Sequence, residues 1–187
     1  MSALISPAGN DAVARRRNDG TYSIGVAGSA FRSAVTVTRP SNTTAYTAGD
    51  VVGDTSGSAI ITLSSIGPSG GYVLVQSVSL IFSDTAVISG MSAFRLHFYS
   101  ASPTAIADNA VFDLVSGERA NYMGYVDLAT PVDFGSSLYT QTDYPGRMIK
   151  LATGSSTLYC ELETKGAYTP ASASTIEVRV ATLEAGL

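Results

Sequence analysis

Hydrophobic and polar residues alternate along most of the apolar segments of this chain. The segment FRLHFYS (94–100) is the clearest case, with apolar residues on one side of a strand and residues expected to face solvent on the other: Phe94, Leu96 and Phe98 against Arg95, His97 and Tyr99. A period of two residues is typical of a β-strand with one buried face, because successive side chains point to opposite faces of a sheet. The pattern therefore predicts strands rather than helices.

The segment GYVLVQSVSLIFS (71–83) predicts the longest strand. One apolar face is expected to be interrupted at Gln76 and to carry these residues: Tyr72, Leu74, Val78, Leu80 and Phe82. Further short strands are expected between links that carry Pro, Gly, Ser or Asp. They fall at 31–39, 59–66, 109–114, 122–128, 136–141, 147–152, 157–163 and 174–184, with one more within 45–52.

No segment keeps a 3.6-residue period over three turns, so we expect less than about a tenth of the residues in helix. Roughly eight to ten short strands in one domain are typical of a sandwich or jelly roll. We therefore predict an all-β protein, an antiparallel β-sandwich that is jelly-roll-like and formed by residues 31–187. Residues 1–30 lack a sustained period and are expected to form an extended N-terminal arm.

Composition and charge exclude several classes of protein. A chain of 187 residues that is 45% hydrophobic can form one domain with its own core. The net charge of −4 disfavours a nucleic-acid partner, because such proteins usually carry a basic surface. No apolar run approaches the ~20 residues of a membrane span. The basic run near the N-terminus follows the weakly apolar part, unlike a secretory signal. We expect synthesis in the cytosol and no membrane partner.

Residues that could support catalysis or bind a metal are sparse. Cys160 is the only cysteine, and it shares a strand face with Leu158 and Leu162, which favours a buried, inert thiol over a nucleophile. His97 is the only histidine, so a histidine-cluster metal site is not possible, and we expect a solvent-facing structural role for it. The carboxylates are scattered, and a hydrolase would rest on them alone. We expect no enzyme activity, no catalytic or metal-binding residue and no cofactor.

The densest charge in the chain is Arg15–Arg16–Arg17, within the predicted arm. Two interpretations stay open, a solvated stretch of tail or a contact with an acidic partner surface. On the second, Arg15, Arg16 and Arg17 are the candidate partner-binding residues. The segment RPSNTTAYTAGDVVGD (39–54) is rich in turn residues, and we interpret it as a connection between strands rather than as a site.

Three segments carry a resemblance to a known family. VTVTRPSNTTAYTAGDVVGD (35–54), SPTAIADNAVFDL (102–114) and NYMGYVDL (121–128) resemble small structural proteins of tailed-bacteriophage virions, in particular head decoration or cement proteins. The resemblance covers about residues 40–130, and the first segment is the most specific. It implies a β-sandwich or jelly-roll domain, often trimeric, that binds the outside of the phage head and holds neighbouring capsid subunits together. The family has no catalytic residues to transfer.

Two functions follow from this resemblance and from the composition. The first is a structural virion protein at the capsid surface that decorates and stabilises the capsid, with itself as a homotrimer and the major capsid protein as partners. The low charge and ten tyrosines without tryptophan suit surfaces that pack against protein. The alternative is a tail or fibre module that binds a host surface glycan or protein, which would need a concave patch of aromatic rings and carboxylates.

Overall fold

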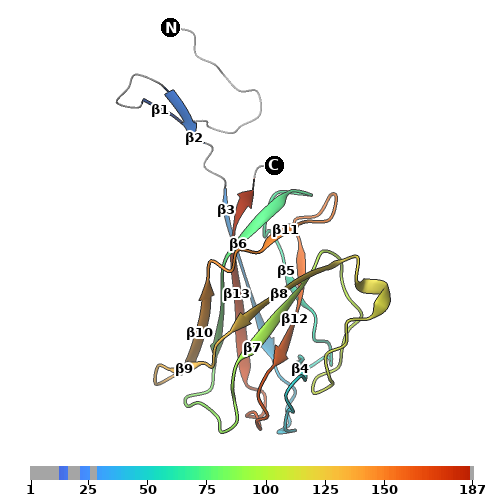
Figure 1. The fold of residues 1–187 in the computed structure, drawn as a ribbon. Helices are drawn as coiled ribbons and strands as arrows, with labels where there is room; N and C mark the ends of the chain where they lie inside the picture. The colour runs from blue at the N-terminus through green and yellow to red at the C-terminus, as the bar shows by residue number, and fades with distance from the viewer. Residues whose placement is uncertain (1–12, 17–21, 26–28, 186–187) are drawn as a thin grey trace.

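The computed structural model describes residues 13–16, 22–25 and 29–185 (Figure 1). Strands β1 (Val13–Arg16) and β2 (Tyr22–Gly25) lie in the predicted arm and pair with each other, antiparallel, as a separate two-stranded sheet. The remaining strands form two sheets that pack face to face (Figure 1). The boundary between arm and domain at residues 30 and 31 stays a prediction.

The first sheet has the order β3-β13-β6-β10-β9, with β11 also paired to β6. Its strands are β3 (Ala30–Thr38), β6 (Tyr72–Phe82), β9 (Val132–Asp133), β10 (Leu138–Asp143), β11 (Met148–Lys150) and β13 (Thr175–Ala185). The second sheet has the order β4-β12-β7-β8, with β5 also paired to β12. Its strands are β4 (Val51–Val52), β5 (Ile61–Leu63), β7 (Phe94–Tyr99), β8 (Tyr122–Leu128) and β12 (Leu158–Thr164).

The pairing pattern is that of a jelly roll. The short collinear strands β4 and β5 count as one strand, and the short strands β9 and β11 are left out, which gives eight strands in chain order. The first of these eight, β3, pairs with the last, β13. The second then pairs with the seventh, β4 and β5 with β12. The third pairs with the sixth, β6 with β10, and the two middle strands, β7 and β8, pair with each other. Such a folded ribbon of strand pairs closes into the two Greek keys of a jelly roll. The predicted fold class is confirmed.

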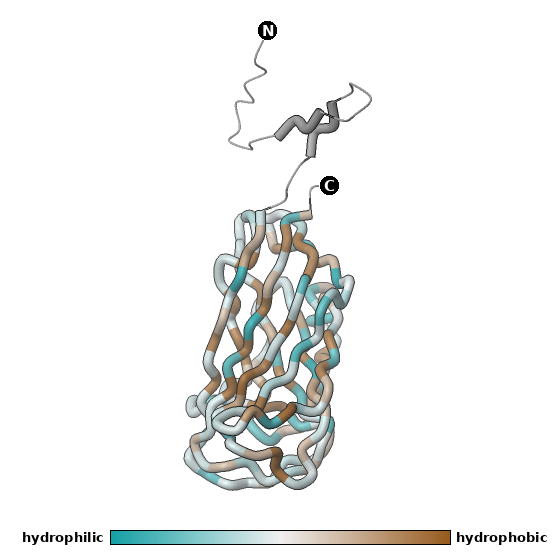
Figure 2. Tube along the Cα trace, turned by 90° about the vertical axis from the view of Figure 1, so that its left-hand side faces the viewer, coloured by the Kyte–Doolittle hydropathy of each residue, from teal (hydrophilic) through white to brown (hydrophobic). Residues whose placement is uncertain are grey.

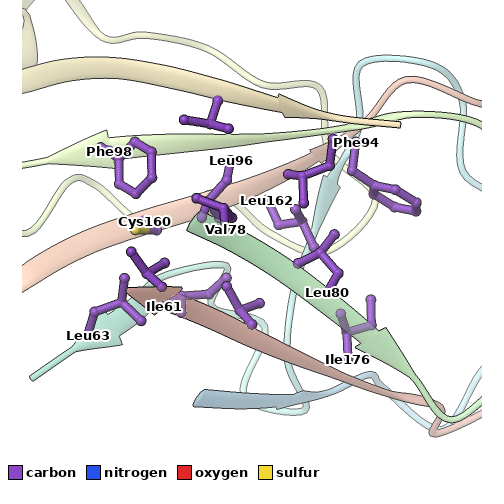
Figure 3. Close-up of a cluster of buried hydrophobic side chains, with 14 of the residues drawn as sticks. Ile61, Leu63, Val78, Leu80, Phe94, Leu96, Phe98, Cys160, Leu162 and Ile176 are labelled. Carbon is purple, nitrogen blue, oxygen red and sulfur yellow. The ribbon is translucent and has the colours of Figure 1, made fainter. Parts of the chain in front are cut away.

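Both sheets contribute apolar side chains to one core between them (Figure 3). Phe94, Leu96 and Phe98 of β7 are fully buried there, as the alternation in the sequence predicts. Hydrophobic and hydrophilic positions alternate along the strands in Figure 2. Cys160 of β12 is also fully buried in this core, which confirms the expected buried thiol (Figure 3). Burial raises the pKa of that thiol, so it is neutral as well as inaccessible.

Strand β6 departs from its predicted face. Val73 and Val75 are fully buried, whereas Leu74 is only partly buried, so the prediction was wrong for the first half of the strand and correct from Val78 onward. The register between β13 and β6 shifts at Gln76, because Ala181 pairs with Ser77 and Thr182 with Val75. Gln76 is therefore the extra residue of a β-bulge. One inserted residue reverses which side chains point into the core.

Residues 109–114, which the alternation predicts as a strand, form no strand. Only an isolated bridge between Asp50 and Val111 is present there. The helical content of the described residues is one 3₁₀ turn, η1 (Ser116–Glu118). None of the helical segments in the described ranges has the length and hydropathy needed to cross a membrane.

Candidate functional site

The outer faces of the two sheets differ in what covers them. On the second sheet, three strands send polar and aromatic side chains away from the core, and we call this set the covered face: Arg95, His97 and Tyr99 of β7, Glu161 and Glu163 of β12, and Tyr122, Tyr125 and Asp127 of β8. Residues 100–121, which link β7 to β8 and which we call the covering segment, contact this face, because Phe112 stacks on His97 with ring centroids 3.7 Å apart. The expectation that His97 and Tyr99 face solvent is therefore wrong, because both are buried.

His97 is buried, with 2% of its surface exposed. Its Nε2 lies 3.0 Å from Glu163 Oε2, and its Nδ1 lies 2.9 Å from the Tyr122 hydroxyl. An ionised carboxylate can only accept hydrogen bonds, so Nε2 donates to Glu163 and the Tyr122 hydroxyl donates to Nδ1. Lys165 donates a second hydrogen bond to Glu163, at 2.9 Å.

The surroundings of His97 keep it neutral. Burial lowers the pKa of His97 and outweighs the opposing effect of Glu163. Burial also disfavours ionisation of Glu163, but hydrogen bonds from Lys165 and His97 lower the pKa of that carboxyl overall. Both ring nitrogens are occupied and Phe112 lies on the ring. The His97–Glu163 pair therefore holds the covering segment in place and is not accessible to a substrate.

Tyr99 and Glu161 lie deeper in the covered face. Tyr99 is fully buried and Glu161 is 1% exposed. The Tyr99 hydroxyl and Glu161 Oε1 have no hydrogen-bond partner among the described residues. Burial, with a smaller contribution from the neighbouring charge of Glu118, raises the pKa of Glu161 to about 7. Glu161 lies on the polar side of an alternating strand, so no local pattern marks it as a buried group.

A second buried polar cluster fixes the segment 39–54. Arg39 is fully buried, and its Nη2 lies 3.1 Å from Asp108 Oδ2. The Tyr46 hydroxyl donates to Asp108 Oδ1 at 2.6 Å and accepts a hydrogen bond from Arg39 Nε. The amide of Gly53 also donates to Asp108 Oδ1, at 2.9 Å. Because Asp108 belongs to the covering segment and Arg39 follows β3, the cluster ties the two together. This role supports the interpretation of 39–54 as a connection.

Glycine is required at position 53 for this contact. A Cβ atom placed there would lie 2.8 Å from the Cβ of Asp108 and 2.9 Å from its backbone. Such a distance does not occur between real Cβ atoms, so a larger residue would push the covering segment away from Gly53.

The outer face of the first sheet carries exposed or partly exposed side chains, and we call it the open face. It comprises the outward-pointing residues of five strands: Ala30, Arg32, Ala34, Thr36 and Thr38 of β3; Glu177, Arg179, Ala181 and Leu183 of β13; Leu74, Ser77, Ser79 and Ile81 of β6; Tyr139, Gln141 and Asp143 of β10; and Met148 and Lys150 of β11. Only Ser79 is buried among them, at 7% exposure. The middle of the face holds small residues such as Ala34 and Ser79 together with the ion pair between Arg179 and Glu177.

Apolar side chains gather at both ends of the open face. At one end Val132 pairs across the strands with Tyr139, and Tyr139 pairs with Ile81. Phe134 lies edge-on to Tyr139, with ring centroids 5.9 Å apart, and is 70% exposed. At the other end Met148 pairs with Leu74, which pairs in turn with Leu183 of β13. Exposed apolar clusters of this kind mark surfaces that contact other proteins.

The predicted partner-binding arginines are not tested by this geometry. Arg15 and Arg16 belong to β1, and Arg17 lies outside the described residues. Their contact with a partner stays a prediction. Within 29–185 and the two short strands of the arm, no group of three or more His, Cys, Asp or Glu side chains is placed to hold a metal ion.

Comparisons with known proteins give structural similarity only. No protein-family model matches the chain, and no curated protein matches its sequence significantly. The chain is similar to one in the structure of Israeli acute paralysis virus heated to 63 degrees, a full particle, with 16% identity, coverage of 100% of this chain and 83% of that chain, and a TM-score of 0.32.

It is also similar to a chain of Turnip Yellow Mosaic Virus at 100 K, with 10% identity, coverage of 86% and 95%, and a TM-score of 0.29. For Cocksfoot mottle virus the identity is 8%, the coverage is 85% and 97%, and the TM-score is 0.25. With TM-scores this low, the fold assignment rests on the strand pairing itself.

Proposed function

We propose that the protein is a structural component of a virus particle that binds other protein subunits through its open face. The observation that carries this proposal is the asymmetry between the two sheets. The chain covers the outer face of one sheet with its own segment, but leaves the outer face of the other sheet partly exposed, with apolar clusters at both ends. The apolar clusters of this face can pack on another protein surface without burying a charge of their own.

The finer form of the proposal is a decoration protein at the surface of a phage head. In that form the protein self-associates as a homotrimer and binds the major capsid protein in the assembled shell. An assembled capsid repeats the same surface many times, so a symmetric oligomer can make several weak contacts at once and bind tightly overall. The sequence resemblance to tailed-phage decoration proteins supports this form. The jelly-roll fold is compatible with it but occurs with many functions.

The arm is included in this proposal. Residues 1–30 would extend from the sandwich domain, residues 31–187, and Arg15, Arg16 and Arg17 would contact an acidic surface of a neighbouring subunit. Deletion of residues 1–30 should then weaken capsid binding and leave the β-type circular dichroism spectrum unchanged.

A glycan-binding tail module is supported less well. Tyr125 is the most exposed aromatic side chain of the covered face, at 39% exposure. The guanidinium of Arg95 lies over the Tyr125 ring, 3.7 Å from its centroid, and also pairs with Asp127 at 2.7 Å. One face of the ring is therefore already occupied by this arginine and is not free for a sugar to stack on.

The test is a substitution on the open face with a matched control elsewhere. Phe134→Asp places a charge in one apolar cluster, and Val111→Asp does the same at an exposed valine of the covering segment, 66% exposed. We expect Phe134→Asp to weaken self-association or co-sedimentation with capsids that lack the protein by about tenfold or more. Val111→Asp should leave both unchanged. Equal behaviour of the two variants, or a monomer that does not bind capsids, would contradict the proposal.

A further inference from the structure

Strand β3 is an open edge of the first sheet, and the hydrogen bonds at its ends show which backbone groups are free. Arg39 N donates to Ser174 O, and Glu184 N donates to Ser29 O, both at 2.9 Å. Both pairs continue the register of β3 with β13. Hydrogen-bonded pairs recur at every second residue of an antiparallel ladder, so the odd-numbered residues of β3 bond to β13.

The even-numbered residues therefore turn their N–H and C=O groups to the free edge: Ala30, Arg32, Ala34, Thr36 and Thr38. No strand in the described part of the chain pairs with this edge, and no other backbone hydrogen bond reaches it. Nine residues make it a long edge with no proline. Edges of that kind are templates for another strand.

The core is also incompletely closed beside this edge. Val35 and Ser33 point into the sandwich but are only half-buried, whereas their partners on β13, Val178 and Val180, are fully buried. Phe31 is likewise half-buried. A strand added outside β3 would cover these inward-facing side chains as well as bind the free backbone groups.

We propose that β3 pairs with β3 of a second copy of this chain, antiparallel, across a two-fold axis at Ala34. In this register Ala34 faces Ala34 of the second copy, Arg32 faces Thr36, and Ala30 faces Thr38. Every free N–H and C=O group of the edge then has a partner. The two first sheets become one continuous sheet through both molecules, and the contact is isologous, as a two-fold axis requires.

Charge favours this register over the neighbouring one. A pairing shifted so that the axis lies at Arg32 would place the two Arg32 side chains opposite each other, which is unfavourable. With the axis at Ala34, Arg32 lies opposite a threonine whose neighbour in the next strand is Glu177. Only β3 of the second copy then separates Arg32 of the first copy from Glu177 of the second. On the inward side, Phe31 faces Val37 of the second copy and Ser33 faces Val35, which extends the apolar core.

The β3–β3 contact is small, and we expect it to add to other contacts between subunits rather than to hold two copies together alone. A single pair of strand edges buries less than the ~1,200 Å² of a stable interface, so the isolated dimer is weak. The contact uses the backbone edge of β3 and leaves Phe134 and Met148, in the apolar clusters at the two ends of the open face, uncovered, so both contacts can form in one assembly. In an assembly held at other surfaces, a two-fold link of this kind gains strength from the high effective concentration of neighbouring copies.

Charge exchange tests the register. In the Thr36→Arg variant, the new arginine of each copy faces Arg32 of the other copy, so the dimer contains two like-charge pairs. This should weaken association of the full chain about tenfold in sedimentation experiments. Adding Arg32→Glu makes both pairs opposite in charge and should restore association. Within one chain the two positions are about 13 Å apart along the strand, too far for direct contact. Recovery in the double variant therefore reports contact between copies. Equal weakening in the single and double variants would overturn the proposal.

Hydrogen exchange tests the free edge directly. In dilute protein the amides of Arg32, Ala34 and Thr36 should exchange fast, whereas those of Ser33 and Val35 should be protected. At concentrations up to about 1 mM, where a contact of this affinity forms, the even-numbered amides should become protected too. Ala34→Pro, which removes one donor from the edge but none from the pairing with β13, should abolish the change.

Two results would refute the pairing. Even-numbered amides that are already protected in the dilute monomer would mean that a segment of the same chain, such as the β1–β2 hairpin, covers the edge. Even-numbered amides that stay unprotected at about 1 mM would mean that no second copy binds there. Phe134→Asp leaves the β3 edge intact, so the two proposals can fail separately. If Phe134→Asp does not weaken subunit binding but the β3 amides still become protected, the proposed function fails and this pairing stands. If Phe134→Asp weakens subunit binding but the β3 amides never become protected, the pairing fails and the proposed function stands.

Discussion

Replacing Glu161 by glutamine should stabilise the protein at alkaline pH and have little effect at acid pH. Glu161 is 1% exposed, and its Oε1 has no hydrogen-bond partner among the described residues. A buried carboxylate with an unpaired oxygen is costly, and burial is the largest influence on this group, so the folded protein favours the neutral acid. Glutamine has nearly the same shape as the protonated side chain and does not titrate. The substitution therefore removes the cost of ionisation and keeps the packing.

The magnitude follows from the pKa. Burial raises the pKa of Glu161 from its ordinary value of 4.5 to about 7. Each pKa unit corresponds to about 1.36 kcal/mol, so the preference of the fold for the neutral form is about 3 kcal/mol. Between these two pKa values the folded protein binds more protons than the unfolded chain. The stability contributed by this group is therefore complete below pH 4.5 and is lost as the pH rises to about 7.

The assay is urea unfolding of the wild type and Glu161→Gln from about pH 5 to about pH 8. The difference in unfolding free energy should grow by up to about 3 kcal/mol in favour of the variant across this range. Other groups titrate in both proteins and cancel in the difference. Glu177→Gln is the control, because its hydrogen bond to Arg179 lowers the pKa of Glu177 and the variant should gain nothing at alkaline pH. A difference for Glu161→Gln that does not change with pH would refute the reasoning.

Two further predictions concern buried groups. Cys160 is fully buried, and burial raises the pKa of its thiol, so it should resist thiol reagents in the native protein and react rapidly in denaturant; rapid native labelling would show that the β12 face is accessible. Asp108→Ala leaves Arg39 buried without its carboxylate and should lower the unfolding free energy by about 3–5 kcal/mol in urea titrations. Adding Arg39→Met should recover part of that loss, and an equal or larger loss in the double variant would show that the charge of Arg39 is not the cause.

Local alternation accounts for much of the fold. The inward faces of β7, β12 and the second half of β6 follow from a period of two, because a strand with one buried face needs apolar residues at every second position. The same pattern, without a helical period, indicates the all-β class and the buried position of Cys160. These features depend on neighbours in the chain, so the sequence alone was enough to predict them.

Other features depend on contacts between distant segments. Arg95, His97 and Tyr99 have the alternation of a solvent-facing strand side, yet His97 and Tyr99 are buried because a later segment folds over them. The pairing of Arg39 with Asp108 joins residues far apart in the chain, and no local pattern marks either as buried. The bulge at Gln76 is defined only by its register with β13. Burial of a polar side chain and the register of a strand are properties of the partner as much as of the segment itself, so only the tertiary structure decided them.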